Sequence, residues 1–272
     1  MFEGNSTTSG EGAHGAAVYG ATAFTNCVFR KNKSTVNDIL DSWGSAENCV
    51  FEENEAKGAF FWGAGKANRC KFFKNKMGSA FNQSSLSTMN CLFASNTCTS
   101  SSGIITAGRQ VNSTFIGNYC TSGAVSDSII GSSCVAINCL FYQNRAHNVT
   151  YNDMAMRKTK STGVCLNPWA TNCIWTAETV YDESMKAECY ARTKDCKCIP
   201  ADQIKILVPG EGDRFYELKG RSPARDGGYE GDGILDYVGE LDLAKGTRRM
   251  FNAIDIGCYE LQKLPGLMLL VR

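Results

Sequence analysis

The chain has 272 residues, of which 43% are hydrophobic and 27 are glycine, and its 28 Lys and Arg nearly balance its 27 Asp and Glu. This balance predicts no nucleic-acid partner and no polybasic membrane patch, because both need a basic field. The apolar run Leu267 to Val271 is far shorter than the roughly 20 residues that cross a bilayer, so we expect no transmembrane segment. Phe2 to Asn5 already fits the repeat described next, so we expect no signal peptide, and a fragment of a longer protein is one interpretation.

A block of the form Asn-Cys-x-Phe-x-x-Asn recurs along the chain from Asn26 to Trp175. Successive copies of its Cys position are separated by 22, 21, 21, 22, 26 and 34 residues. A period near 22 residues is too short for a two-helix repeat of roughly 33 to 47 residues and is typical of one coil of a β-solenoid. The residues at the Cys position are Cys27, Cys49, Cys70, Cys91, Ser113, Cys139 and Cys173.

The Cys and Phe positions of each block are two residues apart, so on a strand both side chains point to the same side. The residue between them is a lysine at Lys71, which indicates that this intermediate position faces outward and that Cys and Phe face inward. Stacked coils then place like side chains about 4.8 Å apart and form ladders of Phe and of Asn, with the Asn amides bonded to corner backbone. We expect the cysteines to be buried free thiols, because neighbouring parallel strands hold Cβ atoms too far apart for a relaxed disulfide.

A second column, formed by Gly15, Asn37, Gly58 and Gly78, precedes the next Cys position by 12 or 13 residues. Because Gly and Asn both tolerate positive φ, we expect a tight corner in this column. The residues two positions later are apolar and predict another inward-facing strand. Each coil therefore has at least two strands, and three are favoured.

The units Phe51-x-x-Asn54-x-Ala56-x-Gly58-Ala59-Phe60 and Phe141-x-x-Asn144-x-Ala146 resemble the FxxN and GGAI repeats of bacterial polymorphic outer-membrane proteins. The resemblance implies an all-β fold, a right-handed parallel β-helix of the pectin-lyase type with about 22 residues per coil, over residues 1–176. Residues 177–199 lack the period and are interpreted as a connector or inserted loop. That loop contains three cysteines, Cys189, Cys196 and Cys198, which could form a local disulfide or a zinc ligand set. Their spacing fits no standard zinc pair, so we predict no metal site.

Three segments of the C-terminal region, Ser222 to Gly228, Asp242 to Arg248 and Asp255 to Glu260, follow one another in order. In that order they resemble the conserved elements of the choice-of-anchor Q domain, with Arg225 and Cys258 as departures from its pattern. That family stands at the C-terminal end of secreted bacterial β-helix proteins, so the resemblance implies an extracellular or outer-surface location. We expect residues 200–272 to form an irregular cap that covers the exposed backbone of the last coil.

An aromatic column follows the glycine column, since Phe61 and Phe81 stand three positions after two of its members, beside Trp62 and Tyr19. If this column faces outward, as the corresponding position of the resembling repeats does, it forms a flat strip suited to sugar rings or to a partner protein. The competing interpretation is a strip covered by a loop or by the C-terminal tail, or a column that faces inward. The candidate binding residues are therefore Tyr19, Phe61, Trp62 and Phe81.

Together these patterns predict a secreted or surface-displayed monomer that acts in adhesion or binds a polysaccharide or a host cell-surface protein, without catalytic residues or a cofactor. One alternative is a polysaccharide lyase or glycoside hydrolase of the same fold, and another is a structural spacer. Such enzymes place clustered carboxylates beside a basic residue. The nearest carboxylates, Asp38 and Asp41, stand several coils from Arg109 and are expected on the solvated surface.

Overall fold

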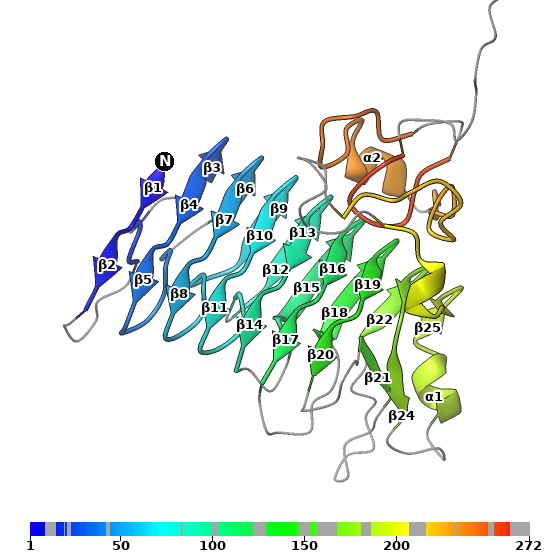
Figure 1. Ribbon diagram of the computed structural model, residues 1–272, viewed down its shortest axis with the longest axis horizontal. Coiled ribbons are helices and arrows are strands. Elements are labelled where there is room, and N and C mark those ends of the chain that lie inside the picture. Colours follow the sequence, from blue (N-terminus) through cyan, green and yellow to red (C-terminus); the bar gives the residue numbers. More distant parts are fainter. Residues whose placement is uncertain are drawn as a thin grey trace, which may run out of the picture.

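A computed structural model describes residues 1–8, 15–18, 20, 23–41, 44–82, 84–99, 103–121, 129–146, 153–156, 168–180, 186–206, 216–231, 233–249 and 253–261. Its regular structure is mostly short strands, which form three parallel sheets that run along a solenoid (Figure 1). Equivalent residues of neighbouring coils, such as Asn32 and Asn54, are 22 residues apart in the chain. The predicted parallel β-helix is therefore confirmed, with three strands in a complete coil.

Sheet I contains β1 (Phe2–Glu3), β4 (Val28–Arg30), β7 (Val50–Glu52), β10 (Lys71–Phe73), β13 (Leu92–Ala94), β16 (Thr114–Ile116), β19 (Leu140–Tyr142), β23 (Ile174–Trp175) and β26 (Lys197–Cys198). Sheet II contains β2 (Ser6–Thr7), β5 (Lys33–Ser34), β8 (Glu55–Ala56), β11 (Lys76–Met77), β14 (Thr97–Cys98), β17 (Tyr119–Cys120) and β20 (Arg145–Ala146). Sheet III contains β3 (Ala23–Thr25), β6 (Ser45–Glu47), β9 (Gly65–Asn68), β12 (Leu86–Met89), β15 (Ile105–Val111), β18 (Ile130–Ile137), β22 (Trp169–Thr171) and β25 (Thr193–Lys194). The remaining elements are the strand pair β21 (Met154–Met156) and β24 (Glu178–Val180), the helices α1 (Lys186–Tyr190) and α2 (Ile234–Val238), and the 3₁₀ turn η2 (Ala201–Gln203).

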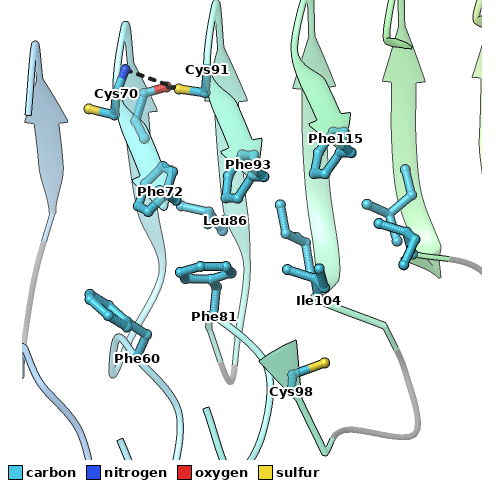
Figure 2. Packing of buried hydrophobic residues seen from close by; sticks show 14 of the residues in the cluster. Phe60, Cys70, Phe72, Phe81, Leu86, Cys91, Phe93, Cys98, Ile104 and Phe115 are labelled. Carbon is cyan, nitrogen blue, oxygen red and sulfur yellow. Dashed lines mark hydrogen bonds between the residues drawn. The ribbon is translucent and has the colours of Figure 1, made fainter. Parts of the chain in front are cut away.

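The Phe side chains of sheet I form one continuous stack inside the solenoid (Figure 2). Successive ring centroids are 4.5 to 5.0 Å apart, and the ring planes lie within 4 to 10° of parallel. This stack confirms that the Cys and Phe face of each block points inward. Its members are Phe2, Phe29, Phe51, Phe72, Phe93, Phe115 and Phe141.

An asparagine ladder runs along the corner between sheets I and II, as the sequence predicts. Asn75 Oδ1 accepts hydrogen bonds from the backbone N–H and from Nδ2 of Asn54, at 3.1 and 3.0 Å. Asn75 Nδ2 donates to the Phe51 carbonyl and to Asn96 Oδ1, at 2.8 and 3.0 Å. Each buried amide therefore uses both of its polar ends, and the corner backbone is satisfied without water.

Asp153 takes the place of the next asparagine at one end of this ladder. Its Oδ1 accepts from the backbone N–H and from Nδ2 of Asn144, and its Oδ2 accepts from Thr176 and from the Ala177 N–H. Burial raises the pKa of this carboxyl, and the donors of Asn144 and Thr176 act in the opposite direction. Because the folded-state pKa is raised, the contribution of Asp153 to stability is fully present at low pH and is lost as the pH rises through that pKa.

The cysteines of the repeat form a second ladder beside the Phe stack. The Cys49 backbone N–H donates to Cys70 Sγ at 3.4 Å, and the Cys70 N–H donates to Cys91 Sγ at 3.5 Å. The described cysteines are all free, which confirms the predicted free thiols at the described positions. Burial raises the pKa of Cys134 and of Cys258 to about 12, so these two thiols stay protonated at neutral pH.

We expect a thiol-alkylating reagent to label native protein at Cys198, which is exposed, and to reach Cys70 and Cys91 only after denaturation, because both are fully buried. Burial also raises the pKa of Cys198 to about 11, so its labelling should accelerate as the pH rises. Peptide mapping by mass spectrometry after alkylation without reductant measures this. Ladder cysteines that stay blocked in the denatured, unreduced protein would contradict the free-thiol ladder.

The tight corners of the coil lie at residues other than the predicted glycine column. Of that column Gly15 has a φ of 70°, whereas its other three members lie outside the left-handed region. Left-handed residues occur instead just before the Cys position, as at Asn48 with φ 52°, and two residues after the Phe, as at Glu53 with φ 54°. The reason for glycine at Gly78 is close approach, because an added Cβ would lie 1.7 Å from the Lys57 carbonyl oxygen.

The solenoid continues into the segment that the sequence analysis interpreted as a connector. β25 pairs with β22 in sheet III, and β26 pairs with β23 in sheet I. Asp195 is left-handed like the repeat asparagines, the Cys173 N–H donates to Cys196 Sγ at 3.3 Å, and Cys198 lies opposite Trp175. Cys196 and Cys198 therefore occupy the Cys and Phe positions of one more coil. The domain limits at residues 176 and 199 stay predictions.

The described part of the C-terminal region packs against the side of the solenoid (Figure 1). Its Leu218 and Ile256 join a buried cluster with outward-facing Leu92, Leu140 and Ile174 of sheet I. These residues thus lie on the outward face of sheet I, and the expected cap over the last coil stays a prediction. The physical reason for their position is that the outward position of sheet I becomes mostly apolar from Leu92 onward, and burying that face is favourable.

Helix α2 makes a similar contact with sheet III. Its Ile234 and Val238 pack in a second cluster with outward-facing Val111 and Ile137. Asn90 Nδ2 also donates to the Val238 carbonyl at 2.9 Å. The C-terminal region therefore covers parts of two sheets and leaves neighbouring columns of sheet III at the surface.

Candidate ligand-binding site

The structure does not bring the three described members of the predicted binding site together on a surface. Phe61 and Phe81 are fully buried, Trp62 is 42% exposed, and Tyr19 lies outside the described residues. Phe61 meets Phe72 of the inner stack at 6.0 Å between ring centroids, and Phe81 meets it at 5.1 Å. The outward aromatic strip is therefore wrong, and the alternative of an inward column holds for both phenylalanines.

The cause is the irregular backbone around these residues. Phe61 belongs to no regular strand and makes single bridges to Leu40 and Asn82. Phe60 and Phe61 are both fully buried, so the alternation of inward and outward side chains expected of a strand fails there. Figure 2 shows Phe60 and Phe81 directed at the interior beneath Phe72.

The carboxylates considered for an enzyme site are also inside the protein. Asp38 is 1% exposed and Asp41 is 7% exposed, so the expected solvated position is wrong for both. Arg109 lies on β15, several coils further along sheet III. The structure does not bring these carboxylates and this arginine together.

A different column places an aromatic side chain at the surface. The residue four positions before each Cys position lies on the outward face of sheet III, where Arg109 pairs with Val135 and Val135 pairs with Trp169. Val135 is 39% exposed and Trp169 is 53% exposed, and both are among the large apolar side chains left at the surface. The full column is Ala23, Ser45, Lys66, Ser87, Arg109, Val135, Trp169 and Arg192.

Two arginines and a tyrosine complete this surface, which we call the Trp169 patch and define as Arg109, Val135, Trp169, Arg192 and Tyr237. The Arg192 guanidinium lies 4.7 Å from the Trp169 ring centroid, and the Arg109 guanidinium lies 4.8 Å from that of Tyr237. Tyr237 is on α2, which the C-terminal region holds against sheet III. The patch therefore combines two aromatic rings with an arginine guanidinium over each of them.

The constant offset from the Cys position was the signal that could have identified this column from the sequence. The strand of sheet III that precedes each Cys position has its own alternation of inward and outward side chains, which the glycine column does not give. The change from Ser87 through Arg109 to Trp169 along one column would have marked the later coils as different from the earlier ones.

The three motif segments of the C-terminal region meet in a buried polar network. Asp255 Oδ1 accepts from the Asp226 N–H at 2.6 Å, and Glu260 Oε2 accepts from the Asp255 N–H at 3.0 Å. The Glu260 N–H donates to Asp242 Oδ2 at 2.9 Å. Carboxylate oxygens of Asp226, Asp255 and Glu260 lie within 4.8 Å of one another, and burial raises the pKa of Asp255.

Arg248 is the cation of this network and is almost completely buried. It donates to the carbonyls of Asp255 and Gly257, at 3.1 and 2.6 Å. Burial lowers the pKa of this guanidinium, while nearby Glu260 and Asp242 raise it. Because these side chains bind main-chain groups of neighbouring segments, we interpret the network as the structural centre of the C-terminal region.

No family model matches the chain, and no curated protein matches it. The fold and the site therefore rest on the geometry alone. Within the described ranges, no helix combines the length and the apolar character needed to cross a membrane.

Proposed function

We propose that this chain is a non-catalytic glycan-binding protein that acts in adhesion at a bacterial surface, and that the Trp169 patch is its binding site. The observation that carries the proposal is the exposure of the Trp169 ring on a strand of a parallel sheet. Rigid elements position a binding side chain better than loops do. The proposed surface location rests on the resemblance of the repeats to bacterial polymorphic outer-membrane proteins and of the C-terminal segments to the choice-of-anchor Q domain.

The chemistry of the patch suits a sugar. A flat indole offers a large apolar face at little conformational cost, and the apolar face of a pyranose ring stacks on such a surface. Val135 extends the apolar area beside the indole, and Arg192, whose guanidinium lies over the ring, can donate hydrogen bonds to the hydroxyl groups of a sugar. A protein partner would use the same ring, so the binding assay also includes immobilised surface proteins.

We expect Trp169→Ala to reduce binding on a glycan array by at least about tenfold, which corresponds to about 1.4 kcal/mol of lost stacking. The matched control is Trp62→Ala, which removes the other described exposed tryptophan and the one surface residue retained from the sequence-based site. Circular dichroism should be unchanged in both variants, because neither ring is part of the buried core.

Four outcomes decide against the proposal. Equal binding by Trp169→Ala and the unmodified chain would show that the Trp169 patch is not the binding site. Loss of binding in Trp62→Ala alone would place the binding site at Trp62. Binding to immobilised surface proteins without any glycan signal would assign the patch to a protein partner. Release of unsaturated sugar in the same assay would identify a lyase instead.

A further inference from the structure

We infer that the Trp169 patch selects an acidic oligosaccharide, carboxylated or sulfated, and that Arg109 is the residue that determines this selectivity. The inference rests on the proposed function and adds the charge of the ligand to it. Its starting point is the surroundings of the Arg109 side chain on sheet III.

The Arg109 guanidinium has no counterion in the described part of the chain. Its guanidinium lies over the Tyr237 ring, and its Nε is buried without a hydrogen-bond acceptor. Two other arginines of the solenoid lie beside carboxylates, since Arg30 pairs with Glu52 at 2.9 Å and Arg69 pairs with Glu47. A half-buried cation with unused donors stabilises an approaching anion more than a solvated or paired cation does.

The geometry of the side chain also favours an anion over a neutral hydroxyl group. A guanidinium offers a planar fork of donors that matches the two oxygens of a carboxylate or sulfate. The Tyr237 ring limits the orientations of this fork, so less side-chain entropy is lost on binding. The C-terminal region thus contributes to the site by placing α2 beside β15.

The arrangement along the column indicates the size of the ligand. Arg109 and Trp169 are separated by Val135, that is by two steps between neighbouring strands, or about 10 Å. Arg192 lies on the far side of Trp169 and supplies a second cation. A ligand that reaches Arg109 while stacking on Trp169 therefore spans several sugar units along the solenoid axis.

The test compares Arg109→Gln with Arg145→Gln on an array that carries each oligosaccharide in neutral, carboxylated and sulfated form. Arg145 is a matched control, because its guanidinium lies 4.7 Å from the Tyr119 ring on another sheet. We expect the unmodified chain to prefer the charged forms, and Arg109→Gln to lower their binding at least tenfold without changing binding of the neutral forms. Arg145→Gln should leave both unchanged, and the dependence of binding on salt should weaken in Arg109→Gln alone.

The outcomes separate this inference from the function on which it rests. No preference for charged forms, or an equal loss for neutral and charged forms in Arg109→Gln, overturns the anionic ligand while Trp169→Ala still reports a glycan site. Binding that survives Trp169→Ala, or no binding to any printed glycan, overturns both. A preference for sulfated over carboxylated forms, or the reverse, supports the inference and identifies the acidic group.

Discussion

Replacing Phe72 with alanine is expected to lower the free energy of unfolding by about 3 to 5 kcal/mol, a large part of the stability of a typical domain. Phe72 is fully buried and stacks on Phe51 at 4.9 Å and on Phe93 at 4.5 Å, with the Phe81 ring edge-on at 5.1 Å. A ladder of parallel strands has little freedom to collapse around the missing ring, so the loss includes a cavity term. Figure 2 shows the Phe72 ring beside that of Phe93, with Phe81 beneath them.

Urea unfolding followed by circular dichroism measures this effect. The matched control is Phe73→Ala, one residue later on β10, where the ring points outward, is half-buried and has Lys74 at 4.9 Å from its centroid. We expect the control to lose less than half as much. Equal losses in the two variants would mean that the inner stack has no special role in stability.

Replacing Asn75 with aspartate is expected to be the most damaging nearly isosteric change in the ladder, costing at least about 3 kcal/mol at neutral pH. A carboxylate can still accept the two hydrogen bonds from Asn54, but it cannot donate to the Phe51 carbonyl or to Asn96 Oδ1. Two buried acceptors would then face a negative charge. Because burial raises the folded-state pKa of such a carboxyl, the loss should shrink as the pH falls and the carboxyl regains a proton to donate.

Unfolding of Asn75→Asp at several pH values, next to Asn26→Asp, tests this explanation. Asn26 is an exposed corner residue with a φ of 55°, a conformation that aspartate also adopts. We expect Asn26→Asp to change stability by about 0.5 kcal/mol or less, without the acid recovery. An Asn75→Asp protein whose deficit is constant from pH 4 to pH 8 would contradict the donor argument. Asp153 shows why position matters, since its carboxylate meets donors alone.

The interior of the solenoid was predictable from the sequence because one local pattern repeats. Phe29, Phe51 and Phe72 each sit in the same phase relative to Cys and Asn, and parallel stacking then requires them to meet. The asparagine ladder follows from the same register. The additional coil with Cys196 and Cys198 was not predicted, because helix α1 interrupts the repeat pattern before it.

The surface was less predictable because burial there depends on other parts of the chain. The outward position that the resembling repeats imply for Phe61 fails, because the backbone there makes single bridges in place of a strand. Trp169 and Tyr237 are far apart in sequence and share a surface only because α2 packs on sheet III. No local pattern in residues 216–261 states which face of the solenoid they cover.

The Phe ladder keeps its register although the chain between its members lengthens. Phe115 pairs with Phe141, and Phe141 pairs with Trp175 across a longer stretch of sequence. The additional residues fall between sheets II and III, upstream of β18 and β22. The connection between sheets II and III can therefore gain or lose length at little cost to folding. New recognition loops can be inserted there, next to Trp169, without a change in the stacked sheets.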